Sequence, residues 1–164
     1  MAAILIERIA AAICRGAVWL AAGAVLACLV LICWSVGMRY LLHQPIPWVD
    51  EAVGYLLVAM VMLGAADALR GGDHLAVDIV TQKLGSRGKR ITRIAGLLSV
   101  MLVGGFLLVE GLQTVAFNRD FGMRSTGYLS IAMWIPQLLI PAGGLLLTIA
   151  AFADLCRLTL GQRE

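Results

Sequence analysis

Residues 45–80 read PIPWVDEAVGYLLVAMVMLGAADALRGGDHLAVDIV, and this stretch decides how the chain folds. It opens with two prolines and a tryptophan, reaches the acidic pair Asp50 and Glu51, and then carries no charge until Asp67. A helix needs roughly 20 mostly apolar residues to cross the hydrocarbon layer of a bilayer. The stretch therefore predicts a transmembrane helix over 49–70 with a polar collar at each end.

Both collars match the chemistry of helix ends. Proline disfavours helix in the residue before it, so the two prolines separate this helix from the preceding one. Trp48 can bury its ring at the membrane interface while its N–H stays hydrated. Asp50 and Glu51 face the positive end of the helix dipole, and Arg70 faces the negative end. The sequence thus predicts where this helix begins and ends.

The composition places the whole chain in a membrane. Hydrophobic residues make up 61% of the 164 residues and charged residues 14%, with a mean hydropathy of +0.92. A soluble domain of this size cannot bury so much apolar surface. We therefore expect an all-α integral membrane protein with four transmembrane helices, and no water-soluble domain. The predicted spans are 16–38, 49–70, 93–117 and 127–153.

Two shorter segments have the pattern of helices that lie along a membrane surface. Between the second and third spans, the apolar positions of 74–84 share one broad arc, which predicts a short amphipathic interfacial helix. Before the first span, isoleucines alternate with Glu7 and Arg8. That pattern fits either a short surface helix or a frayed N-terminal turn.

The basic residues predict the orientation, because Lys and Arg are retained on the cytoplasmic side of a membrane. Of the 13 Lys and Arg residues, only Arg39, Arg119 and Arg124 lie beside the loops that follow the first and third spans. Both termini are therefore expected in the cytoplasm, and the basic belt is expected to contact a bilayer with an anionic inner leaflet. The net charge of +3 reflects this belt and does not indicate binding to nucleic acid.

The carboxylates at the two ends of the second span allow two interpretations. Ordinary helix-end chemistry explains both, and Asp67 is close enough to Arg70 on the helix to be neutralised by it. Alternatively, Glu51 or Asp67 takes part in ion or proton movement, because carboxylates near membrane depth are costly. The two lie about 24 Å apart along the helix, so they belong to opposite membrane faces.

Other candidate residues indicate packing more than chemistry. Glu110 and Gln113 share a face of the third span, and Glu110 lies about 25 Å from Arg93, which predicts an interfacial or partner-facing carboxylate. Paired glycines in the third and fourth spans predict a bend or a close packing seam. The four cysteines lack the paired spacing of metal or redox sites. We expect neither a cofactor nor a metal.

These residues resemble a known family, the small membrane subunit of TRAP (tripartite ATP-independent periplasmic) transporters. The resemblance rests first on one patch: Arg39-Tyr40, Pro47-Trp48, Asp50-Glu51, Gly64-Ala65-Ala66, Arg70, His74 and Val77-Asp78. A weaker patch contains Leu129, Met133-Trp134 and Pro141 to Gly143. The rest of the chain agrees with the family in hydropathy and number of spans.

The resemblance implies a non-catalytic subunit in the inner membrane of a bacterium. In this family the small subunit joins a large membrane subunit that binds substrate and sodium ions. A periplasmic binding protein delivers the substrate, typically an organic acid such as a C4-dicarboxylate or a sialic acid. The small subunit would then serve as a scaffold for the large one.

We expect a set of polar and aromatic residues to serve structure or contact with the partner. They are Arg39, Trp48, Asp50, Glu51, Asp67, Arg70, His74, Asp78 and Trp134. Within this set, Trp48, Asp50 and Glu51 should fix the outer end of the second helix. Arg39 is the nearest opposite charge in the sequence, so we expect it to pair with Glu51 there.

Two other classes of protein share some of these features. A self-sufficient small exporter also has four spans, but it needs a glutamate within the membrane core, whereas the carboxylates here are expected near the faces. A membrane electron-transfer subunit needs paired histidines at matched depth, and His43 and His74 are expected on opposite sides. The chain also lacks the broken helices with polar groups at the midplane that mark a substrate site.

Overall fold

The computed structural model describes residues 2–70 and 86–159, and four long helices dominate these ranges. They are α1 (Ala2–Leu41), α2 (Trp48–Arg70), α4 (Ser86–Asp120) and α6 (Leu139–Thr159), with a single-turn helix, α5 (Trp134–Gln137), just before α6. Four segments are long and apolar enough to cross a membrane: Ala12–Leu41, Trp48–Leu69, Gly88–Asp120 and Trp134–Cys156. The prediction of four transmembrane helices is confirmed.

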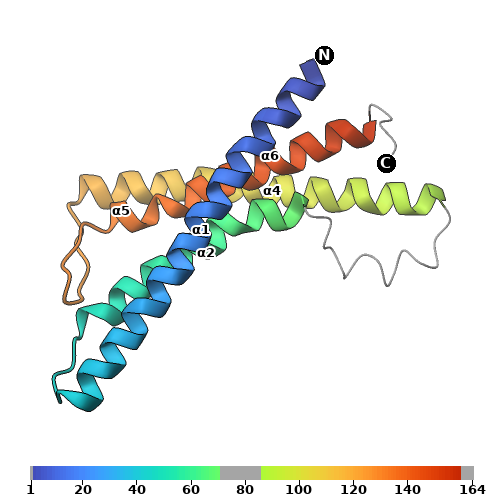
Figure 1. Ribbon diagram of the computed structural model, residues 1–164. Helices are drawn as coiled ribbons and strands as arrows, with labels where there is room; N and C mark the ends of the chain where they lie inside the picture. The colour runs from blue at the N-terminus through green and yellow to red at the C-terminus, as the bar shows by residue number, and fades with distance from the viewer. Residues whose placement is uncertain (1, 71–85, 160–164) are drawn as a thin grey trace.

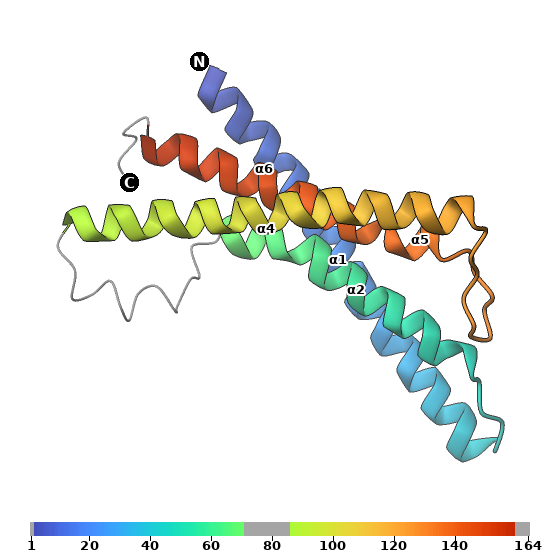
Figure 2. The same ribbon diagram turned by 180° about the vertical axis from the view of Figure 1, so that it is seen from behind.

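The long helices form two hairpins that cross each other (Figure 1). One hairpin pairs α1 with α2, the other pairs α4 with α6, and α2 also packs against α6. The view from behind in Figure 2 shows the same crossing and places the N-terminus and the end of α6 at one end of the molecule. The loops at 42–47 and 121–133 lie at the other end.

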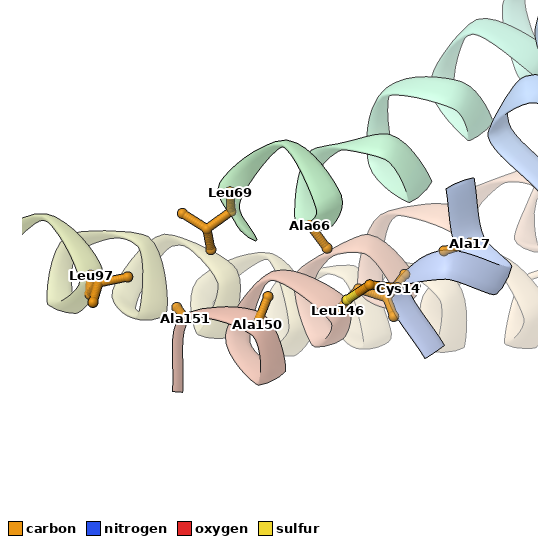
Figure 3. Packing of buried hydrophobic residues seen from close by; sticks show 8 residues of the cluster. All are labelled: Cys14, Ala17, Ala66, Leu69, Leu97, Leu146, Ala150 and Ala151. Carbon is orange, nitrogen blue, oxygen red and sulfur yellow. The ribbon is translucent and has the colours of Figure 1, made fainter. Parts of the chain in front are cut away.

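The core lies where the two hairpins cross, and small side chains dominate it (Figure 3). All four long helices contribute to this cluster of buried residues: Cys14, Ala17, Ala66, Leu69, Leu97, Leu146, Ala150 and Ala151. Ala66, Ala150 and Ala151 have no exposed surface. Apolar side chains gain little free energy when they exchange lipid tails for protein neighbours. Helices in a membrane therefore associate through close packing, which small residues allow.

A seam of glycines joins α4 to α6. A Cβ atom added to Gly144 would lie 2.7 Å from the carbonyl oxygen of Gly104 and 2.8 Å from the amide nitrogen of Leu108. A Cβ atom added to Gly111 would lie 2.9 Å from Cδ of Pro141. The backbones are therefore in direct contact, and the predicted packing seam is confirmed.

Several boundaries differ from those predicted. α1 is continuous from Ala2, because no proline interrupts it and its isolated glycines, Gly16, Gly23 and Gly37, do not break a helix. α4 begins at Ser86, ahead of the expected residue 93. The fourth span begins at Trp134 and not near residue 127, because residues 121–133 form a hydrogen-bonded loop. The predicted interfacial helix at 74–84 lies outside the described residues.

Gly144→Ala should lower the midpoint of thermal unfolding in detergent. The added methyl group would collide with the backbone of α4, and overpacking of this kind costs about 1–3 kcal/mol. Gly105→Ala is the matched control, because nothing lies within 4 Å of a Cβ atom added there. Intrinsic tryptophan fluorescence reports both transitions. Equal midpoints for the two variants would contradict the seam.

Candidate functional site

The turn between α1 and α2 places Glu51 at the start of α2. The Gln44 N–H donates to the carbonyl of Met38 at 3.1 Å, while His43 adopts a left-handed φ of 53°. Histidine is among the non-glycine residues that tolerate this region best. The Val49 side chain is buried, 1% exposed, which anchors the first turn of α2. Glu51 follows in that same turn.

α4 ends in a Schellman motif at the same end of the molecule. Gly122 has a φ of 59° and donates its N–H to the carbonyl of Arg119 at 3.2 Å. The Met123 N–H donates to the carbonyl of Asn118 at 2.9 Å. This pair of bonds satisfies carbonyls that the helix leaves open, and the left-handed glycine makes them possible.

The chain between α4 and α5 forms a loop with internal pairing. The Ser125 N–H donates to the carbonyl of Ile131 at 2.8 Å, and the Met133 N–H donates to the carbonyl of Met123 at 3.0 Å. These bonds hold the two arms of the loop side by side. In both Figure 1 and Figure 2 the loop extends toward the first turn of α2.

One carboxylate joins this loop to α2. Glu51 Oε1 accepts a hydrogen bond from the Tyr55 hydroxyl at 2.7 Å and another from the Ser125 hydroxyl. Glu51 Oε2 accepts the backbone N–H of Leu129 at 3.0 Å. The Ser125 Oγ in turn accepts the N–H of Gly127 at 3.1 Å. We call Glu51, Tyr55, Ser125, Gly127 and Leu129 the Glu51 junction.

Gly127 is the point at which the loop backbone passes against the carboxylate. A Cβ atom at this position would overlap the carboxyl group of Glu51. A larger residue here would therefore displace the carboxyl group from its present position. The loop backbone and the carboxylate are therefore in close contact where the hydrogen bonds of the junction form.

A second polar contact supports the base of the loop. Asn118, only 7% exposed, donates from Nδ2 to Oε1 of Gln137 in α5. A buried amide needs such a partner, because leaving it unpaired costs free energy. The end of α4 is thereby tied to the helix that leads into α6.

The structure brings one of the predicted site residues, Glu51, into the junction. The other described members form none of its hydrogen bonds: Arg39, Asp50 and Asp67 are exposed, Trp48 is 40% exposed, and Trp134 is half-buried at the start of α5. The side chain of Arg70, and residues His74 and Asp78, lie outside what the structure describes.

The expected pairing of Arg39 with Glu51 is not seen. Arg39 is exposed at the end of α1, and among the described residues no ion pair joins the two. Sequence reasoning missed the actual partners of Glu51. Tyr55 could have been found, because it lies one helical turn after Glu51. Ser125 could not, because it is 74 positions away in the sequence.

Residues 28–161 match the family described as tripartite ATP-independent periplasmic transporters, DctQ component. The chain is 26% identical over 138 residues to the sialic acid TRAP transporter small permease protein SiaQ of Vibrio cholerae, a match that covers 82% of this chain and 78% of that protein. It is 29% identical over 100 residues to the C4-dicarboxylate TRAP transporter small permease protein DctQ of Rhodobacter capsulatus. That second match covers 61% of this chain and 44%, less than half, of the relative.

The four spans and the sequence match define a membrane component of a transport system. The chain belongs to the DctQ family, the small permease subunits of TRAP transporters. Such subunits are transport components and not enzymes, and membership of the family implies partnership with a large membrane subunit and a periplasmic binding protein. The resemblance is confirmed, and the small exporter and the electron-transfer subunit are set aside.

Glu51→Ala should release the loop from α2. The amide of Leu129 loses its acceptor, so its hydrogen exchange should become about tenfold faster, as expected when a hydrogen bond to a charged group is lost. Asp50→Ala removes the exposed neighbouring carboxylate and is the matched control, with no change expected. Hydrogen-exchange mass spectrometry of peptides spanning 121–133 measures both. Unchanged exchange in Glu51→Ala would show that the loop holds its shape without the carboxylate.

Proposed function

We propose that this chain is the small, non-catalytic subunit of a sodium-coupled TRAP transporter that imports an organic acid. In this proposal a periplasmic binding protein delivers the acid, and the large membrane subunit carries the substrate and the ions. The two similar permease proteins are named for sialic acid and for C4-dicarboxylates, both organic acids. Their names support the substrate class.

The apolar interior supports the role of scaffold for the large subunit. The core cluster consists of alanine, leucine and cysteine. Among the buried residues that the structure describes, only Ser35 and Asn118 are polar. A transporter's substrate and ion sites are built from polar groups on interrupted helices near the midplane. The described interior is apolar apart from these two residues, which is suited to holding a partner in place.

The same proposal includes an orientation in the bacterial inner membrane. Both termini lie in the cytoplasm, and the Glu51 junction lies on the periplasmic side. The exposed basic side chains Lys89, Arg90 and Arg93 support this, because they gather in the first turns of α4, at the end of the molecule opposite the junction. There they would meet the anionic lipids of the inner leaflet, at about 1 kcal/mol for each charge.

Vesicles that contain only this chain should accumulate no organic acid in a sodium gradient. Uptake of radiolabelled sialic acid or C4-dicarboxylate should appear only when the large membrane subunit and the binding protein are also present. Vesicles with the large subunit and the binding protein but without this chain are the control for the scaffold role, and they should show little uptake. Sodium-driven uptake by the isolated chain would contradict the proposal.

A further inference from the structure

α4 carries a charge on a face that is turned away from the rest of the described bundle. Glu110 lies within the span Gly88–Asp120, and its side chain is exposed. The next residue, Gly111, packs against Pro141 of α6. Successive residues of a helix point about 100° apart, so Glu110 points away from the seam between α4 and α6.

Glu110 lies inside the span and not at its edge. From Glu110, α4 continues to Asp120, which is about 15 Å of helix. Exposed apolar side chains lie on both sides of it along the helix, with Phe106 before it and Phe117 after it. The sequence predicts an interfacial or partner-facing carboxylate at this position, and the place of Glu110 within the span favours the partner-facing alternative. A carboxylate within a membrane span is costly in lipid, so such groups normally face a partner.

Glu110 is the centre of a distinct face of α4. Side chains three, four or seven positions apart on a helix share a face, and those around Glu110 are all exposed. We call the set the Glu110 face: Val103, Phe106, Glu110, Gln113 and Phe117. The exposed side chains Leu98, Leu102 and Val109 border this face on one side, and all three are apolar.

The Glu110 face retains hydrogen-bonding capacity that the chain itself does not use. Thr114 and Ser99, on the same side, donate to the backbone carbonyls of Glu110 and Ala95 at 2.8 and 3.0 Å, so both hydroxyls are satisfied. Among the described residues, the side chains of Glu110 and Gln113 form no hydrogen bond or ion pair. Lipid tails offer no hydrogen-bonding groups, so these two side chains require a polar partner.

α1 shows the contrasting case. Between exposed Trp19 and Trp34, the large exposed side chains of its span are all aliphatic: Leu20, Val25, Leu26, Leu29, Val30 and Ile32. Lipid tails can cover such a surface without a cost in free energy, because both are apolar. The two exposed faces therefore have different requirements, and only the Glu110 face needs a neighbour with polar groups.

We propose that the Glu110 face is the contact surface for the large membrane subunit. Glu110 and Gln113 bind a basic side chain that this subunit presents at the same depth, and Phe106 and Phe117 cover the pair from lipid. The Phe117 ring is already held from one side, because it packs against Phe121 with ring centroids 4.5 Å apart. A basic partner supplies the opposite charge without which a carboxylate is not retained in a membrane. This inference rests on the proposed scaffold function and names the surface that performs it.

Site-specific photo-crosslinking in the assembled transporter tests the surface. The photoreactive residue p-benzoylphenylalanine replaces Phe106 or Phe117, and in the controls it replaces Leu26 or Leu29 on the exposed aliphatic surface of α1. Crosslinks to the large subunit should form from the first two positions and not from the controls. Crosslinks from the controls alone, or from none of the four positions, would overturn the proposal.

Glu110→Leu tests the polar contact within that surface. The large subunit recovered with an affinity-tagged small subunit should fall by at least about tenfold, because its basic side chain is left unpaired. Leu29→Ala, on the exposed aliphatic surface of α1, should recover as much as the unchanged chain. Full recovery with Glu110→Leu would overturn the polar contact. A different result would be that the unchanged chain itself recovers no large subunit. That result would contradict the proposed scaffold function and not only the contact made by Glu110.

Discussion

A carboxylate that is partly withdrawn from water gains from nearby hydrogen-bond donors, and in this protein the donors for Glu51 come from both helical hairpins. The Tyr55 hydroxyl belongs to its own helix, whereas the Ser125 hydroxyl and the Leu129 amide belong to the loop between α4 and α5. Backbone hydrogen bonds join the two arms of this loop, and the loop follows directly from α4. The bonds from Glu51 to the loop therefore also fix the position of the end of α4. The separation of the hairpins at this end therefore depends on one side chain.

The rest of the bundle depends on close approach of backbones. Lipid gives apolar side chains little reason to associate, so helices in a membrane are held by shape and by a few polar bonds. The buried alanines Ala66 and Ala150 at the crossing, and the glycine seam between α4 and α6, supply the shape. The Glu51 junction and the contact between Asn118 and Gln137 supply the polar bonds.

The sequence predicts what depends on short range. Charge-free runs located the spans, the Pro47 to Glu51 stretch located the start of α2, and the paired glycines located the seam. It could not predict the partner of Glu51, because the nearest opposite charge in the chain, Arg39, is not the nearest donor in space. The start of the fourth span was predicted near residue 127 and lies at Trp134, because a contact between residues far apart in the sequence decides it. Leu129 belongs to an apolar run, yet its amide bonds to Glu51 and not to a helix carbonyl.

The central claim is that the Glu51 carboxylate fixes the separation of the two hairpins. Pulsed electron paramagnetic resonance measures this directly, with nitroxide labels at Gln44 in the first loop and at Tyr128, 77% exposed, in the second. In lipid nanodiscs, on a background without the native cysteines, the distance distribution should be narrow. It should broaden in Glu51→Ala and stay narrow in Asp50→Ala. A narrow and unshifted distribution in Glu51→Ala would contradict the account.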